Sequence, residues 1–284
     1  MFDTHVHTFF SKDSRSSPES ICEAAVEKGL EGITITDHLD YDFPGYTESS
    51  YIDFDSYFGY LTKLAARYAS ALKVLKGVEV GIQPHVIEKI LEVVRRYTFD
   101  YVIASVHIIE GLDPYQGSYY EGKTKQEAYG RYLEEVLFAV ERFPDFDVAG
   151  HLDYIIRYAP YSDRSMRYSD HPDLFDTIFK KLILSGRGLE VNTSSYRKNR
   201  GTGTPVGNGG GTGANDAHNR VPVFDVDILK RYRELGGEIV CLGSDSHSPE
   251  YVAYGFGEFL DFLRQAGFRY VAHFEERRPV FEAI

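Results

Sequence analysis

Cysteine is scarce in this sequence. Its 284 residues include two cysteines, Cys22 and Cys241, which form neither a CxxC pair nor a cluster. Disulfide frameworks and zinc–thiolate sites both need grouped cysteines, so the sequence excludes both kinds of site. We therefore expect a protein of a reducing compartment, with the cytoplasm as the default location.

Long apolar runs and an excess of basic residues are also missing. No stretch approaches the roughly 18 apolar residues that a membrane-spanning helix needs, and the first residues lack the pattern of a secretory signal. Asp and Glu number 43 against 31 Lys and Arg, which gives a net charge of −12 at pH 7. Such a charge repels phosphate backbones, so nucleic acid is an unfavoured partner and a membrane is not expected as one.

Hydrophobic residues are plentiful enough for a large folded core. They make up 43% of the chain, with 14% aromatic residues, which suits an α/β protein of this length. Seven short runs rich in β-branched residues have the character of buried parallel strands. These predicted strands are residues 1–7, 32–38, 74–81, 101–107, 147–153, 188–194 and 238–245.

Helical patterns separate the predicted strands. In residues 17–29, Ser17 can cap a helix, Pro18 suits its first turn and Gly29 can end it. Residues 224–237 carry an apolar helical stripe that stops at two glycines. This alternation predicts a parallel α/β barrel with one strand fewer than the common eightfold form, as a single domain over residues 1–284. The strands alone do not distinguish such a barrel from an open, doubly wound sheet. The glycine-rich residues 200–219 are predicted to form a flexible loop.

Metal-binding residue types recur where the predicted strands end. His5 and His7 are two positions apart, so an extended strand directs both imidazoles to one face. The carboxyl ends of parallel strands meet at one rim, where the loops form a common crevice. The rim residues are His5, His7, Asp37, His38, Glu79, His107, His151, Asp245 and His247. Each has an ordinary structural explanation by itself, but together they predict one polar site.

The ordered motifs DTHVHT, ITDH, GVEVG, ASVH, GHLD and GSDSH resemble the polymerase and histidinol phosphatase (PHP) superfamily, and their spacing resembles its histidinol-phosphatase branch. The resemblance implies a distorted seven-stranded (β/α)7 barrel with three divalent metal ions, for which Zn, Mn and Fe are the candidates. It places His5, His7, Glu79 and Asp245 on the first ion and Glu79, His107 and His151 on the second. It places Asp13, His38 and His247 on the third, although many relatives have a histidine where Asp13 stands. Asp37 is interpreted as a residue that orients an imidazole.

Metal-assisted hydrolysis of a phosphate monoester follows from such a centre, because divalent ions activate water and bind phosphate oxygens. The leaving alkoxide needs a proton, for which Asp245, His247 and a metal-bound water remain alternatives. Arg157 and Arg197 lie on predicted rim loops where a guanidinium can bind phosphate, and the resemblance implies the same.

Three functions are therefore compared. We expect a small-molecule phosphomonoesterase acting on L-histidinol phosphate in histidine biosynthesis. The second hypothesis is a PHP phosphoesterase acting on another small phosphate, or on the 3′ end of a nucleotide or nucleic acid, which the acidic charge disfavours. The third is a metal-binding protein without turnover. The sequence leaves the oligomeric state open.

Overall fold

Parallel strands with helices between them form the body of the protein. The computed structural model describes residues 1–197 and 222–284, so the predicted loop at 200–219 lies outside the described residues. The strands of the main sheet are β1 (Phe2–Val6), β2 (Gly32–Ile35), β3 (His38–Leu39), β4 (Lys73–Gly81), β5 (Tyr101–Ser105), β6 (Val148–Ala149), β7 (Gly188–Asn192) and β8 (Val240–Gly243).

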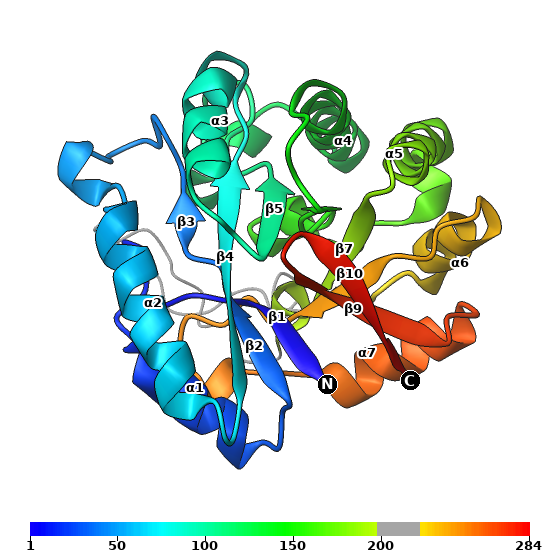
Figure 1. Ribbon diagram of the computed structural model, residues 1–284. Coiled ribbons are helices and arrows are strands. Elements are labelled where there is room, and N and C mark those ends of the chain that lie inside the picture. Colours follow the sequence, from blue (N-terminus) through cyan, green and yellow to red (C-terminus); the bar gives the residue numbers. More distant parts are fainter. Residues whose placement is uncertain (198–221) are drawn as a thin grey trace, which may run out of the picture.

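The seven principal strands follow the sheet order β1-β2-β4-β5-β6-β7-β8, and all their pairings are parallel. The two ends of this sheet meet, because the Thr4 hydroxyl donates to the Leu242 carbonyl at 3.0 Å and the His7 amide donates to the Ser246 carbonyl at 2.8 Å. In the described residues the sheet is thus a nearly closed seven-stranded barrel (Figure 1). The predicted fold class is confirmed.

One predicted strand is divided into two. Residues 32–38 were expected to form a single strand, but β2 ends at Ile35 and the two-residue β3 starts at His38. Both pair with the long strand β4, and β3 places His38 opposite Glu79. The break therefore brings two of the predicted ligands side by side.

Helices cover the outside of the barrel (Figure 1). Ser17 caps the first of them by accepting a hydrogen bond from the Ser20 amide, and Pro18 begins the helix, as predicted. Among the described helices none is long and apolar enough to cross a membrane. The helices are α1 (Pro18–Glu27), α2 (Phe54–Tyr68), α3 (Ile87–Arg96), α4 (Lys125–Arg142), α5 (Pro172–Leu184), α6 (Val226–Glu234) and α7 (Phe256–Gln265).

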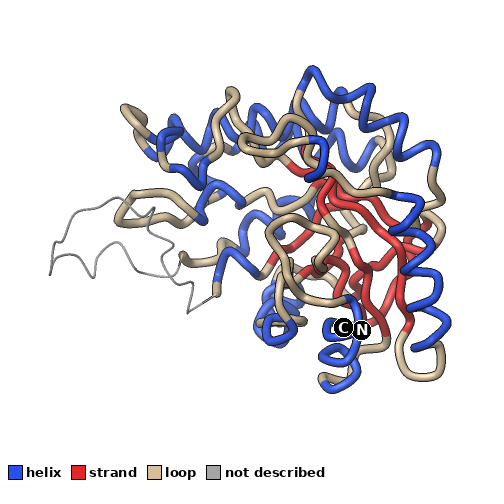
Figure 2. Tube along the Cα trace, turned by 90° about the vertical axis from the view of Figure 1, so that its left-hand side faces the viewer, coloured by secondary structure: helices blue, strands red, loops and turns tan. Residues whose placement is uncertain are grey.

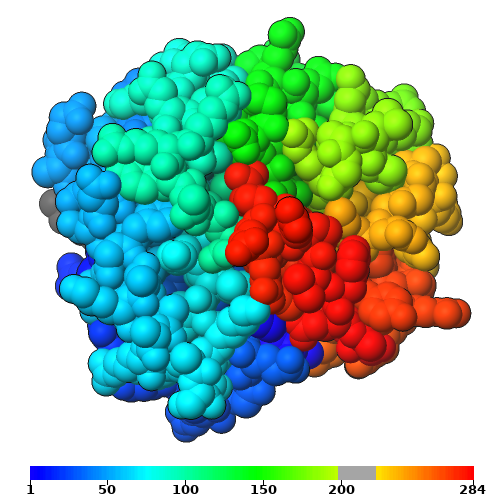
Figure 3. All heavy atoms as spheres, viewed as in Figure 1, coloured from blue at the N-terminus to red at the C-terminus, as the bar shows by residue number. Residues whose placement is uncertain are grey.

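A C-terminal hairpin closes the amino-terminal end of the barrel, a feature that the sequence did not predict. Strands β9 (Tyr270–Glu275) and β10 (Arg278–Ala283) pair antiparallel, and the hairpin fills the middle of the face shown in Figure 3. Phe274 stacks on Tyr101 with ring centroids 5.3 Å apart. Loops gather at the other end of the strands (Figure 2), so this plug leaves that end for the site.

Candidate metal centre

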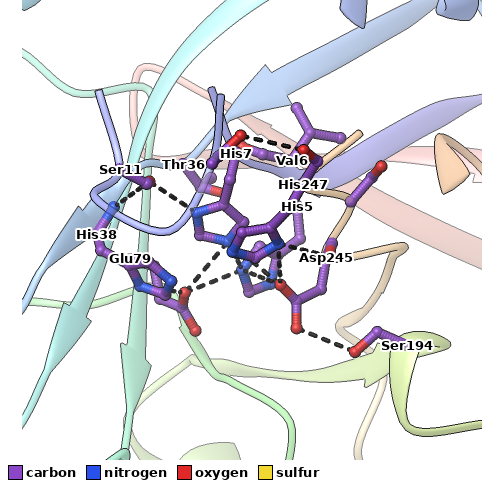
Figure 4. Close-up of polar contacts among 12 residues, drawn as sticks. His5, Val6, His7, Ser11, Thr36, His38, Glu79, Ser194, Asp245 and His247 are labelled. Atoms are coloured by element: carbon purple, nitrogen blue, oxygen red, sulfur yellow. Dashed lines mark hydrogen bonds and ion pairs between the residues drawn. The ribbon is translucent and has the colours of Figure 1, made fainter. Parts of the chain in front are cut away.

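The carboxyl ends of the strands surround a cavity of about 240 Å³. The imidazoles and carboxylates that the sequence predicted as ligands converge there, and Figure 4 shows several of them pointing toward one another. They come from strands and loops that are far apart in the sequence, from His5 to His247. They are described below in the three groups that the resemblance implies. These groups overlap, because Glu79 belongs to two of them and His38 Nδ1 also lies 3.0 Å from Glu79 Oε2.

The first group consists of His5, His7, Glu79 and Asp245. The Nε2 atoms of His5 and His7 are 2.9 Å apart, and Glu79 Oε2 lies 3.1 and 3.4 Å from them, respectively. Asp245 Oδ1 lies 3.9 Å from His5 Nε2 and 3.3 Å from His7 Nε2. Four ligands at about 2.0–2.1 Å from a tetrahedral zinc ion are about 3.3 Å apart. These four atoms therefore have the spacing of a metal site.

The second group uses the other oxygen of Glu79. Glu79 Oε1 lies 3.2 Å from His107 Nε2 and 2.7 Å from His151 Nε2, and these two nitrogens are 3.3 Å apart. The Glu79 side chain is 1% exposed, so its two oxygens face the two groups and not solvent. The arrangement suits a carboxylate that bridges two ions.

Asp13, His38 and His247 form the third group at the mouth of the cavity. Asp13 Oδ2 is 3.0 Å from His247 Nε2 and 3.6 Å from His38 Nε2. The side chain of Asp13 is 51% exposed, that of His247 is 28% exposed and that of His38 is 13% exposed. This group is therefore open to solvent, whereas the first two groups are buried.

Hydrogen bonds fix which imidazole nitrogen is left for a metal. His5 Nδ1 lies 2.5 Å from Glu190 Oε1, and His107 Nδ1 lies 2.8 Å from Asp40 Oδ1. A carboxylate accepts, so each Nδ1 carries a proton, and Nε2 is the nitrogen that faces the site. His247 Nδ1 donates to the Asp245 carbonyl at 3.1 Å in the same way.

Glu190 and Asp40 are two residues of the site that the sequence did not predict. The available signal for Glu190 was a charged residue inside the apolar run GLEVN, and Asp40 follows His38 by two positions in DHLD. Neither signal says which histidine is contacted. That information depends on the neighbouring strands, because Glu190 is 185 positions from His5.

Asp37 acts on the site less directly than expected. Its carboxylate accepts hydrogen bonds from the backbone and hydroxyl groups of Thr8 and Ser11. Ser11 gives its hydroxyl proton to Asp37, so its oxygen accepts from His7 Nδ1 at 3.1 Å. Asp37 was expected to orient an imidazole by direct contact. In the structure Ser11 contacts the His7 imidazole, and Asp37 holds Ser11 in place.

The charges of the cluster perturb its protonation. Burial by itself would raise the pKa of Glu79, but His5, His107 and His38 hold this pKa well below its ordinary value. Burial would likewise raise the pKa of Asp245, and Arg157 and His5 reverse this effect. Burial, together with His247 and His38, lowers the pKa of His7 well below the usual value. The carboxylates are thus ionised and ready to bind cations.

Arg157 lines the cavity but is held by several protein groups. Its Nη2 lies 2.7 Å from Asp245 Oδ2 and 3.1 Å from Asn192 Oδ1, and its Nε donates to Ser195 Oγ at 3.1 Å. Burial opposes its charge, but Asp245 raises the pKa of Arg157 above its ordinary value. Arg157 therefore orients Asp245 as well as adding positive charge to the cavity.

Arg197 also lines the cavity, with a different set of partners. Its Nη2 donates to the carbonyls of Ser244 and Asp245 at 2.5 and 3.0 Å, and its guanidinium lies 4.4 Å from the centre of the Tyr251 ring. Among the described residues its buried Nε has no hydrogen-bond partner. This nitrogen is therefore a buried donor without a partner in the described part of the chain.

Two serines near the cavity contact residues of the site, and a nearby histidine does not. Ser194 donates to Asp245 Oδ2 at 3.1 Å and Ser195 accepts from Arg157, so both hydroxyl groups support the site's own residues. His85 lies away from the cluster, where it pairs with Asp42 at 3.1 Å and is 59% exposed. Lys198 and Arg200 lie outside the described residues.

The residues present fit a divalent metal centre. Glu79 Oε2 is buried and, among the described residues, lacks a hydrogen-bond donor, although three imidazoles surround it. Such an arrangement is costly for a buried polar atom unless a cation completes it. Imidazole and carboxylate ligands suit Zn, Mn and Fe and do not discriminate strongly between them.

Comparison with known proteins agrees with this geometry. The PHP domain family model matches residues 3–194. A "Probable histidinol-phosphatase" of Clostridium acetobutylicum is 32% identical over 98% of each chain. The histidinol-phosphatase of Lactococcus lactis is 31% identical over 96% of this chain and 93% of that protein.

Solved structures show the same similarity. Histidinol phosphate phosphatase of Lactococcus lactis, solved with zinc, L-histidinol and phosphate, superposes with a TM-score of 0.84 and 30% identity over 98% of both chains. A structure from Listeria monocytogenes, at 20% identity, has a TM-score of 0.72 over 91% of this chain and all of that chain, and shares the fold. With a family model that matches most of its length and relatives that align along nearly all of it, this chain belongs to the PHP domain family.

Proposed function

We propose that this protein is a metal-dependent phosphomonoesterase that hydrolyses L-histidinol phosphate to L-histidinol and phosphate. The observation that carries the proposal is one cavity containing both a cluster of metal-binding side chains and two arginines, Arg157 and Arg197. The names of the two relatives above 30% identity support the substrate, as does the ligand set of the Lactococcus structure.

We further propose that the cluster holds three divalent ions, of Zn, Mn or Fe. His5, His7, Glu79 and Asp245 would hold the first ion, Glu79, His107 and His151 the second, and Asp13, His38 and His247 the third. When bound, such ions make a water nucleophilic near neutral pH and offset the charge of the phosphate.

The arginines are proposed to bind the phosphate group. The Arg197 Nε is free of partners among the described residues, and Arg157 keeps its charge in a buried position. A guanidinium that faces phosphate oxygens stabilises the negative charge that develops in the transition state. Positioning by fixed partners, such as the Ser244 carbonyl for Arg197, makes this stabilisation preorganised.

Proton transfer is proposed to involve Asp245, with His247 as the alternative. The pKa of Asp245 lies well below its ordinary value, so this residue is ionised before reaction and cannot begin as the donor. It can take the proton that the attacking water loses and pass it to the leaving alkoxide. His247 Nδ1 donates to a carbonyl, so Nε2 is the nitrogen that either binds the third ion or transfers a proton. His247 can therefore replace Asp245 in proton transfer only when the third ion does not occupy Nε2.

The walls of the cavity suit the histidinol part of the substrate. The carboxylate of Asp40 lies in the same cavity as the rings of Tyr46 and Tyr154. A leaving group with an ammonium group and an aromatic ring can interact with both kinds of side chain. The volume of about 240 Å³ is below the roughly 300–1,000 Å³ that is typical for larger ligands, which favours a small ester.

The test is a substrate panel on protein reconstituted separately with Mn, Zn, Fe and Co. We expect kcat/KM for L-histidinol phosphate to exceed that for phosphoserine, glycerol phosphate and a 3′-phosphorylated nucleotide by at least about tenfold. A higher value for another ester would move the proposal to that substrate class. A folded, metal-loaded protein without turnover on any ester would support a metal-binding role instead.

A further inference from the structure

Glu190 is a buried carboxylate that contacts two of the proposed metal sites without belonging to either. It lies on β7, between β6 and β8 in the sheet order, and is 3% exposed. Its Oε1 is 2.5 Å from His5 Nδ1, and its Oε2 accepts from the His151 amide at 2.8 Å. His5 belongs to the first group and His151 to the second.

The fold leaves a space for this carboxylate. At Gly243, on the neighbouring strand β8, an added Cβ would lie 2.4 Å from Glu190 Oε1 and 2.6 Å from the His5 Cβ. Any larger residue would have to displace Glu190 or His5, because contacts this short do not occur. The glycine therefore permits the pairing of Glu190 with His5.

A second buried carboxylate has the same arrangement. Asp40 Oδ1 lies 2.8 Å from His107 Nδ1, and a Cβ added at Gly81 would lie 1.7 Å from that oxygen. Asp40, however, also lines the cavity, so its replacement would change the surroundings of the substrate. Glu190 is absent from the cavity wall formed by the described residues, which makes it the cleaner case.

We propose that Glu190 is a positioning residue that sets the geometry of the first two metal sites together. This inference depends on the metal sites of the proposed function. Through His5 Nδ1 the carboxylate selects the tautomer whose Nε2 binds metal, and it holds the ring in orientation. Through the His151 amide it fixes the backbone that carries a ligand of the second site.

The decisive variant is Glu190→Gln, which keeps the size of the side chain. Glutamine has one acceptor oxygen where glutamate has two, and its amide nitrogen is a donor. That nitrogen then either faces the donors of His151 and Asn192 or donates to His5 Nδ1. In the second case His5 carries its proton on Nε2, the nitrogen that would bind metal. We expect the affinity for Zn²⁺, measured by chelator competition on the folded metal-free protein, to fall by about 10- to 100-fold.

Kinetics distinguish positioning from substrate contact. Since Glu190 does not reach the cavity, we expect kcat for L-histidinol phosphate at limiting metal to fall while KM stays within about twofold. Saturating Zn²⁺ should restore part of the lost kcat, because the ligands themselves remain. A residue with a purely structural role would lower the thermal stability of the metal-free protein and leave the Zn²⁺ affinity unchanged.

Asp147→Asn is the matched control. Asp147 is also a buried carboxylate, which accepts from the Val102 amide at 2.7 Å and pairs with Arg277 at 2.6 Å, but it lies before β6, near the C-terminal hairpin. We expect this variant to lose stability and to keep its Zn²⁺ affinity. If Glu190→Gln does not fold, Glu190→Asp replaces it, because the shorter carboxylate cannot reach both donors.

Two outcomes would overturn the inference: Zn²⁺ affinity within about threefold of the parent in the folded Glu190 variant, or an equal loss of affinity in Asp147→Asn. Affinity is measured without substrate, so the proposed function is tested separately. The parent protein could hydrolyse no phosphate ester and still bind Zn²⁺ more tightly than Glu190→Gln does. That result would refute the proposed function and support this inference.

Discussion

Replacing the two arginines of the cavity, one at a time, by methionine should separate their contributions to stability and to catalysis. Methionine keeps an unbranched apolar side chain and removes the guanidinium. Arg157 is 9% exposed and pairs with the buried Asp245 at 2.7 Å. Arg197 is partly exposed and donates to two backbone carbonyls. The same chemical change therefore removes a buried ion pair in one case and two hydrogen bonds in the other.

The expected losses of stability differ accordingly. Removing one partner of a buried ion pair costs roughly 3–5 kcal/mol, because the remaining charge is left uncompensated. Asp245 keeps the Ser194 hydroxyl at 3.1 Å and His7 at 3.3 Å, so we expect about 3 kcal/mol for Arg157→Met. For Arg197→Met we expect about 1–2 kcal/mol, the range for hydrogen bonds to a charged group that is partly solvated.

Catalysis should be affected in both variants. Loss of a preorganised donor to the phosphate costs about 2–4 kcal/mol of transition-state binding, or about 30- to 1,000-fold in kcat/KM. Because Arg157 also holds Asp245 and lies within a shared network, the double variant should lose less than the sum of the two single losses. Lysine at position 197 should recover part of the activity, since a point charge lacks the planar fork of a guanidinium.

Urea denaturation in excess chelator measures the stability difference, and steady-state kinetics on metal-saturated protein measures the catalytic one. Equal unfolding free energies for the two variants would contradict the pairing of Arg157 with Asp245. Values of kcat/KM within about twofold of the parent in both variants would show that neither arginine contributes to transition-state binding. In that case the phosphate is bound by other residues.

Three further outcomes are expected. Elemental analysis should find about three metal ions per chain in the parent and about two in Asp13→Asn. It should find about one in Glu79→Gln, because this variant loses the carboxylate shared by two groups. In the metal-free protein, burial lowers the pKa of His107, but Asp40 and Glu79 outweigh burial and raise this pKa to about 9. Protonated His107 therefore contributes fully to stability below its unfolded pKa of about 6.5, and this contribution is lost as the pH rises through about 9. Melting temperatures measured with chelator should decrease between these two pH values. A melting temperature that does not change with pH in this range would contradict the prediction. Phe274→Ala should lower the unfolding free energy by about 3–5 kcal/mol through the cavity it leaves against Tyr101, and kcat/KM should not change, because the hairpin lies at the end of the barrel opposite the site.

The strand positions and the rim residues could be predicted from the sequence because they depend on local patterns. Each β-branched run can be recognised by itself, and the i, i+2 spacing of His5 and His7 directs both rings to one face of a strand. Their Nε2 atoms are indeed 2.9 Å apart. Parallel strands place their carboxyl ends at one rim, so the convergence of the polar residues followed from the fold class.

The contacts between distant segments required the tertiary structure. Glu190 and His5 are 185 positions apart, and their pairing depends on closure of the barrel between β1 and β8 and on the space left at Gly243. Arg157 was predicted to face a phosphate, but its position also allows it to hold Asp245. No local pattern specifies such pairings.

The sequence by itself determined the barrel, the end of the barrel that carries the site, and the chemical types of the groups gathered there, because strand period and motif order are local properties. The tertiary structure decided which carboxylate oxygen faces which imidazole, which histidine nitrogen is free, and that a C-terminal hairpin closes the opposite end. The first two features depend on the distances between side chains from separate strands, and the third depends on contacts between segments far apart in the sequence. Only the packed barrel sets such distances.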